Sequence, residues 1–142
     1  MNFSTREMSA SDYADAMRLW QATEGMGLSS ADTPEGIARY LSRNPGMSYV
    51  AVTERGELAG AVLCGHDGRR GYLHHLAVRE DFRRMGLART LVDCCLERLR
   101  QEGIDKCHIF VYHTNEVGQA FWKAMGWEER KTLVIMSKDI ES

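Results

Sequence analysis

Positive charge and missing side-chain bulk meet at one junction of the sequence, the stretch DFRRMGLAR at residues 81–89. It follows the apolar run LHHLAV and opens a segment, 86–101, whose apolar residues recur with the period of an amphipathic helix. The start of a helix leaves backbone N–H groups unpaired and carries a partial positive charge. A glycine there lets a ligand approach the main chain, and three arginines add mobile cations. The junction therefore predicts a cradle for a phosphate or pyrophosphate; the alternative is a solvated turn that carries arginines.

Groups that can move a proton lie just before this junction, in the run YLHHLAV at 72–78. Alternation along a strand places Tyr72 and His74 on one face and sends His75 to the other, unless a bulge intervenes. An imidazole has an ordinary pKa near 6.5, so His74 is the better suited of the first two to take up a proton near neutral pH. The alternative is that His74 has only a structural role, with the hydrogen-bonding needs of its ring met inside a half-buried sheet.

The elements that position these residues follow from periodicity and from glycine, proline and capping signals. An early antiparallel meander followed by a strand–helix–strand crossover indicates an α+β (mixed α/β) chain. Its central sheet is expected to be mixed, with helices on both faces, and 72–78 and 107–112 should be parallel neighbours. No linker or repeat divides the chain, so we expect one domain over 1–142. The expected strands are 3–7, 47–52, 58–65, 72–78, 107–112 and 132–138, and the expected helices are 9–25, 32–43, 86–101 and 115–125.

Bulk composition excludes several classes of protein. The chain has 142 residues and a formal net charge of −2, which argues against nucleic acid and membrane surfaces as partners. No apolar run approaches the roughly 20 residues that cross a bilayer. The four cysteines and five histidines show no metal-ligand spacing, so we expect no metal. The first residues lack the plan of a signal peptide, which favours a cytoplasmic protein.

Two motifs resemble those of the GNAT acetyltransferase superfamily. The run RRMGLA at 83–88 matches the pattern Arg/Gln-x-x-Gly-x-Gly/Ala between a strand and an amphipathic helix. The run NEVGQAFWKAMGW at 115–127 is similar to the second signature, Asn-x-x-Ala-x-x-Phe-Tyr-x-x-x-Gly-Phe. One helix and one strand separate the motifs, as the family fold requires. The resemblance implies a mostly antiparallel central sheet with a splay between its two central parallel strands.

The resemblance also implies acetyl-CoA, or another acyl-CoA, as the donor. Its pyrophosphate would lie on the backbone amides of the cradle, and its pantetheine arm would pair like an added strand with the end of 72–78. Asn115 matches the position that contacts the arm, while Phe121 would pack beside it or belong to the core. The residues implied for coenzyme binding are Leu76, Ala77, Val78, Arg83, Arg84, Met85, Gly86, Leu87, Ala88, Arg89, Asn115, Phe121 and Trp122.

The family reaction is direct attack of an amine on the thioester. About one alkylamine in a thousand is neutral at pH 7, so a base must remove a proton. We expect His74, with Tyr72, in that role, and a backbone N–H near Leu76 or Ala77 facing the oxyanion. Trp122 stands where relatives carry the tyrosine that protonates the leaving sulfur. An unassisted thiolate costs roughly 2 kcal/mol, and Tyr112 or water could replace the acid.

The acceptor is left open by the sequence: a small primary amine, an amino acid, or a peptide or protein amino group. Glu24 and Asp32, between the first two helices, could attract an ammonium group or lie solvated in a loop. Two other functions compete. One is a non-catalytic acyl-CoA-binding module; the other is a nucleotide-binding protein, which the lack of P-loop and Rossmann fingerprints disfavours. The protein is expected to be a monomer or a homodimer.

Overall fold

The computed structural model describes residues 2–140. The chain forms two compact units, Met1–Phe110 and Val111–Ser142. No helix in the described chain is long and apolar enough to cross a membrane.

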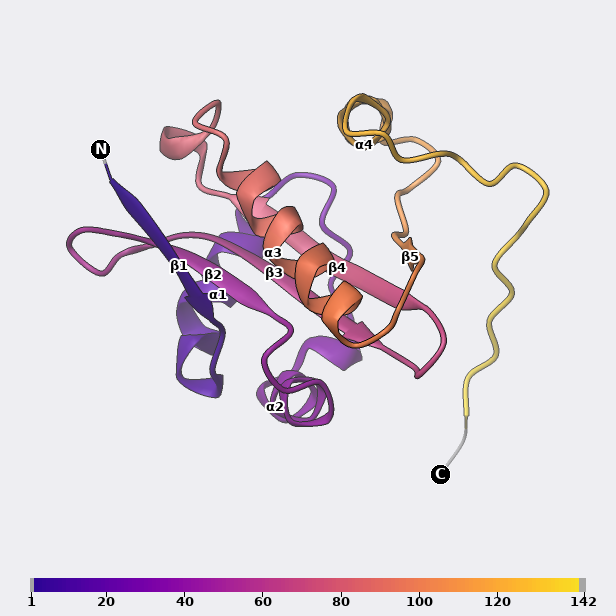
Figure 1. Cartoon of the computed structure of the whole chain (residues 1–142), viewed down its shortest axis with the longest axis horizontal. Helices are drawn as coiled ribbons and strands as arrows, with labels where there is room; N and C mark the ends of the chain where they lie inside the picture. The colour runs from indigo at the N-terminus through magenta and orange to yellow at the C-terminus, as the bar shows by residue number, and fades with distance from the viewer. Residues whose placement is uncertain (1, 141–142) are drawn as a thin grey trace. The chain divides into compact units, whose positions relative to one another are not determined.

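The first unit is built on a five-stranded sheet in the order β1-β2-β3-β4-β5 (Figure 1). The first four strands pair antiparallel with their neighbours, and β4 pairs with β5 in parallel. This confirms the predicted mixed, mostly antiparallel sheet and the parallel neighbours. The parallel pair lies at one end of the sheet rather than at its centre. The strands are β1 (Phe3–Glu7), β2 (Tyr49–Thr53), β3 (Leu58–His66), β4 (Gly71–Val78) and β5 (Cys107–His108).

Helices cover both faces of this sheet, as predicted. Two glycines of β3 show the arrangement, because residues five apart on a strand point to opposite faces. A Cβ on Gly60 would touch Leu91 of α3 (Leu87–Gln101), whereas a Cβ on Gly65 would meet Tyr40 of α2 (Pro34–Arg43). Figure 1 shows α3 across one face, with α1 (Tyr13–Gln21) and α2 behind the other. Three short 3-10 turns complete the unit: η1 (Ala10–Asp12), η2 (Ser30–Asp32) and η3 (Glu80–Phe82).

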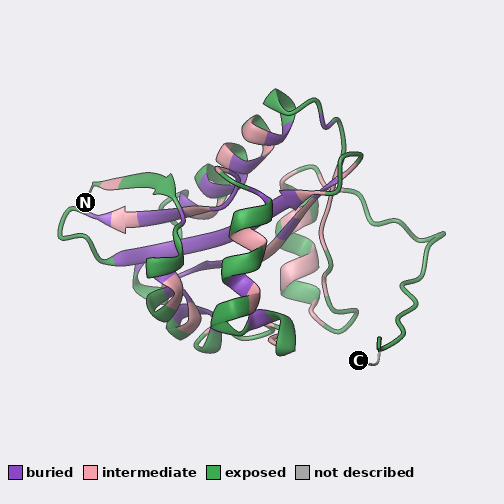
Figure 2. Ribbon diagram, turned by 90° about the horizontal axis from the view of Figure 1, so that it is seen from below, coloured by how far each residue is buried: buried purple, intermediate pink, exposed green. Residues whose placement is uncertain are grey.

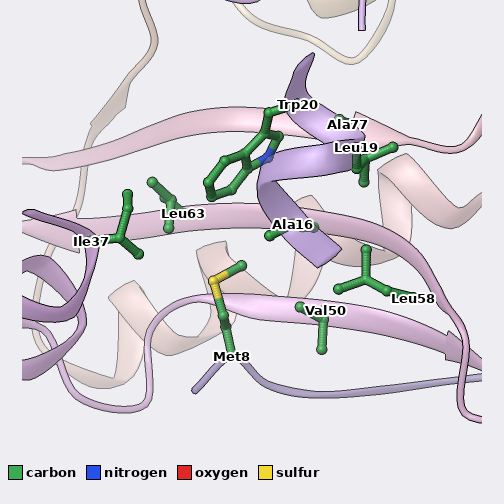
Figure 3. Close-up of a cluster of buried hydrophobic side chains, with 10 residues drawn as sticks. Met8, Ala16, Leu19, Trp20, Ile37, Val50, Leu58, Leu63 and Ala77 are labelled. Carbon is green, nitrogen blue, oxygen red and sulfur yellow. The ribbon is translucent and has the colours of Figure 1, made fainter. Parts of the chain in front are cut away.

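The core on the α1 face centres on Trp20, which is fully buried. It packs with side chains from α1, α2 and the strands, and Figure 3 shows it lying over the sheet near Leu63. Burying an aromatic of this size removes most of its apolar surface from water, the main favourable term in folding. Figure 2 shows burial concentrated on the strands, with the outward faces of the helices exposed. This core fixes α1, and with it the connection to α2, against β3 and β4.

The second unit contains α4 (Glu116–Ala124), which confirms the predicted helix. The strand predicted at 132–138 is absent: residues 133–140 have no regular structure, and Leu133, Val134, Ile135 and Met136 are exposed. The pattern of β-branched residues is right for a strand, but a strand is stable only when its backbone groups pair with a neighbour. No described strand pairs with this run. The strand predicted at 107–112 is likewise reduced to two residues, β5.

A salt bridge joins the N-terminal strand to the first helical turn. Arg6 of β1 donates two hydrogen bonds to the buried carboxylate of Asp12, at 2.8 and 2.9 Å. These bonds hold the pKa of Asp12 below its ordinary value, so Asp12 stabilises the fold above pH 4, and the contribution is lost as pH falls through the lowered pKa.

Replacing Asp12 by Asn should therefore lower the free energy of unfolding at pH 7 by about 1 kcal/mol, since Arg6 is half exposed. Urea unfolding at pH 7 and pH 3 measures this, and the gap between wild type and Asp12→Asn should shrink at pH 3. A gap that widens in acid would contradict the assignment.

Candidate functional site

The centre of β4 carries a β-bulge. Ala61 of β3 pairs with Ala77, and Leu63 pairs with His74, so one residue of β3 faces two of β4 between those pairs. One of the two, His75, has a φ of 55°, in the left-handed region that non-glycine residues rarely adopt. A bulge turns a side chain away from its alternating direction. The bulge that the sequence left open is therefore present, and the exception stated for His75 applies.

The bulge brings His75 to the face covered by α1 and α2. Its Nε2–H donates a hydrogen bond of 2.7 Å to Asp32 Oδ1, and its ring lies 5.1 Å from that of Trp20. The side chain of Asp32 is only 8% exposed, and that of His75 is 15% exposed. The second carboxylate oxygen of Asp32 accepts the backbone N–H of Ser29 at 2.9 Å, and the Tyr13 hydroxyl donates to the Asp32 carbonyl at 2.6 Å. Asp32 is thus not a solvated loop carboxylate.

His74 lies in a cluster of aromatic rings. Its ring stacks on Tyr72 at 6.4 Å and on Phe110 at 6.1 Å, and the edge of Tyr40 meets it at 6.0 Å. Tyr72 and His74 therefore share a face, as alternation predicts. Burial lowers the pKa of His74, and the neighbouring His75 lowers it further, so His74 is neutral at pH 7.

The junction at 83–89 has the features of an anion cradle. Gly86 is the N-cap of α3 with a φ of 80°; no side chain caps this helix end, and its first turn holds no acidic residue. Arg84 also has a left-handed φ, of 66°. Such alternation of backbone conformation points successive N–H groups toward one side. A Cβ on Gly86 would meet nothing within 4 Å, so the approach to these amides is open.

The arginines of the cradle leave their charges available. Arg83 donates from Nε to the Val78 carbonyl at 3.0 Å, which ties the turn to the end of β4. Within residues 2–140, Arg83, Arg84 and Arg89 take part in no salt bridge. No carboxylate of the described residues therefore pairs with these three guanidinium groups. Arg83 and Glu24 also line a cavity of about 650 Å³ between the end of α1 and η3.

A free backbone edge leads from the aromatic cluster to the cradle. Strand β4 pairs with β5 only at Gly71 and Tyr72, whereas it runs on to Val78. The two parallel strands thus separate after their first two pairs. From Leu73 to Val78, β4 has no strand partner on the β5 side in the described chain, so its backbone groups on that side can pair with an extended ligand.

The chain is similar to known proteins over most of its length. The family model described as "Acetyltransferase (GNAT) family" matches residues 13–127. The chain belongs to the GNAT acetyltransferase family. The resemblance inferred from the two sequence motifs is thereby confirmed.

Individual relatives and solved structures are similar to this protein over most of the chain. An acetyltransferase of Pectobacterium atrosepticum is 29% identical over 131 residues, which cover 92% of this chain and 91% of the relative. Among solved structures, Ard1 of Thermoplasma volcanium has a TM-score of 0.77 at 23% identity and covers 89% of this chain and 82% of its own. The PaiA N-acetyltransferase of Thermoplasma acidophilum, in complex with coenzyme A, has a TM-score of 0.76 at 17% identity over 90% and 91% of the two chains. These two structures show the shared fold.

The second GNAT motif lies in the second unit. Asn115 caps α4, because its Oδ1 accepts the Gly118 N–H at 2.9 Å. The ring of Trp122 packs 5.3 Å from Phe121 and 5.0 Å from Trp127, and Tyr112 is exposed. The roles predicted for Tyr112, Asn115, Phe121 and Trp122 in coenzyme binding and catalysis stay predictions.

Sequence reasoning missed the His75–Asp32 pair. It placed Asp32 in a loop and His75 on the far face, because strict alternation cannot anticipate a bulge. One signal was available: SSAD at 29–32 repeats the pattern of SASD at 9–12, in which a serine and an aspartate three residues apart form a capping box. Both aspartates are buried. That pattern predicts a fixed, partly enclosed carboxylate.

Proposed function

We propose that this GNAT protein transfers an acetyl group from acetyl-CoA to a primary amine. The observation that carries the proposal is the start of α3, where Gly86 leaves open backbone amides that no side chain caps. Helix starts of this kind bind phosphate groups. The PaiA structure, which has the same fold, is a complex with coenzyme A, and this supports acetyl-CoA as the donor.

Acetyl-CoA supplies an activated acyl group as a thioester. In our proposal the amides of 84–88 and the side chains of Arg83, Arg84 and Arg89 hold the pyrophosphate. Backbone groups of Leu76, Ala77 and Val78 hold the pantetheine arm along the free edge of β4. A role of Asn115, Phe121 and Trp122 in coenzyme binding, and a single domain over 1–142, are further parts of the proposal.

The acceptor amine must lose a proton before it attacks the thioester. Tyr72, His74 and His75 all lie on the face of β4 covered by α1 and α2, so we place the acceptor on that side. A backbone N–H after the bulge, of Leu76 or Ala77, would face the developing oxyanion. The acid for the leaving sulfur is open between Tyr112 and water.

Incubation with acetyl-CoA and a panel of amines tests the proposal. The panel should contain alkyl diamines, amino acids and peptides with free amino termini, and thiol release should depend on one of these classes. Binding of coenzyme A without thiol release from any amine would instead favour a non-catalytic acyl-CoA-binding module. If ATP or NAD raises the melting temperature while coenzyme A does not, the cradle serves a nucleotide and the proposal fails.

A further inference from the structure

We propose that His75, oriented by Asp32, is the base that takes the proton from the acceptor amine. This inference rests on the proposed acetyl transfer, and it assigns the base to a residue that alternation along the strand would turn away. The geometry is that of a base held by a third group: an imidazole whose one nitrogen donates to a buried carboxylate at 2.7 Å.

The first argument is the bulge. A left-handed φ at a non-glycine residue is strained and persists only where the surrounding structure enforces it. At His75 the enforcing contacts are those of its side chain, with Asp32 from η2 and Trp20 from α1. The strain therefore serves to place this ring on the acceptor face, directly before the amides of Leu76 and Ala77.

The second argument compares two buried carboxylates of the same type. Asp12 and Asp32 both close a capping box on a 3-10 turn, and both are less than a tenth exposed. Asp12 accepts a hydrogen bond from Arg6, a permanent cation, which accounts for the burial of its carboxylate. Asp32 bonds an imidazole, whose charge depends on proton uptake. The carboxylate at Asp32 is thus placed to stabilise a charge that appears during a reaction.

The proton balance is complete without any other reagent. With Nε2–H held by Asp32, His75 Nδ1 carries a lone pair and takes one proton from the acceptor ammonium. The neutral amine forms the C–N bond to the thioester carbonyl carbon, and the C–S bond breaks with its electron pair on sulfur. The second amine proton passes to the thiolate, and His75 returns its proton to solvent. Asp32 touches no reacting atom and is a positioning residue.

The groups that face His75 bear on its pH dependence. On its own strand the neighbouring group is His74, whose ring lies 6.4 Å from that of His75, and from η2 it is Asp32. From α1 they are Trp20, which is uncharged, and Tyr13, which bonds the Asp32 carbonyl. Asp32 is the only anion in contact with the His75 ring among the described residues. Removing its charge should therefore weaken the contact that holds the ring in place and lower kcat.

The test compares four variants of the full chain, His75→Gln, His74→Gln, Asp32→Asn and Asp12→Asn, with the best amine from the panel. The readouts are kcat and KM from pH 5 to 9, together with coenzyme A affinity. We expect His75→Gln to lower kcat about 100-fold and to leave coenzyme A affinity unchanged. The fall of kcat at low pH, which is the acid limb of the pH–rate profile, should be lost in this variant. Asp32→Asn should lower kcat and leave KM for acetyl-CoA unchanged, whereas Asp12→Asn, the matched buried carboxylate, should lower stability and leave kcat in place.

Loss of the acid limb in His74→Gln, with the limb retained in His75→Gln, would overturn the inference and assign the base to His74. A limb retained in both variants would overturn it as well. Should wild type bind coenzyme A yet acetylate no amine, acetyl transfer itself would fail, and the inference with it. Because wild type is assayed first, these failures are distinguishable.

Discussion

Replacing Gly86 by Val should weaken coenzyme A binding by about tenfold to a hundredfold, or about 1.4 kcal/mol for each factor of ten. Gly86 holds a φ of 80° at the start of α3, where its missing side chain leaves the amides open. A branched side chain would stand in the path of the pyrophosphate and would favour a different backbone conformation. Calorimetric titration with coenzyme A measures the loss.

The chain offers a matched control at the other end of the same helix. Gly103 has a φ of 81° and equally open surroundings. Gly103→Val should therefore carry a similar backbone strain and a similar loss of stability, but should bind coenzyme A like wild type. Equal affinities for the two variants would mean that the coenzyme does not use this helix end, and would remove the main support for the proposed function.

The cradle could be predicted from sequence because its signals are local. The change of period at Gly86 predicts a helix start, and the arginines and small residues around it are read directly from the chain. The structure adds what no local pattern states: the left-handed φ of Arg84 and the lack of a side-chain cap at the start of α3 among the described residues. The helix start at Gly86 is present as predicted, and the binding of a phosphate there stays a prediction.

The face of β4 that carries Tyr72, His74 and His75 could be predicted only in part. Tyr72 and His74 share a face because alternation is intrinsic to a strand, and this was expected. The position of His75 depends on one extra residue in β4 relative to β3 and on contacts with Trp20 and Asp32, which are distant in sequence. The same limit explains the run at 132–138, whose strand-like composition cannot supply a pairing partner.

Replacing Trp122 by Tyr should raise kcat by up to about 30-fold below pH 8, the equivalent of about 2 kcal/mol. An indole N–H cannot give up its proton usefully, whereas a phenol can protonate the departing sulfur. A thiol has an ordinary pKa near 8.5, so the advantage should disappear above that pH, where the thiolate leaves without help. The measurement is kcat from pH 6 to 9.5 with saturating acetyl-CoA and the best amine.

Trp122→Phe is the matched control for this gain. It keeps an aromatic ring against Phe121 and Trp127 but supplies no hydroxyl, so any change it shares with Trp122→Tyr comes from packing. If Trp122→Tyr raises kcat only at low pH and Trp122→Phe does not, the wild-type protein works without an acid at this position. Equal rates in all three proteins at pH 6.5 would mean that the sulfur already receives its proton from another group. The exposed hydroxyl of Tyr112 would then be the residue to replace next, because it is the nearest phenol in sequence to the second motif.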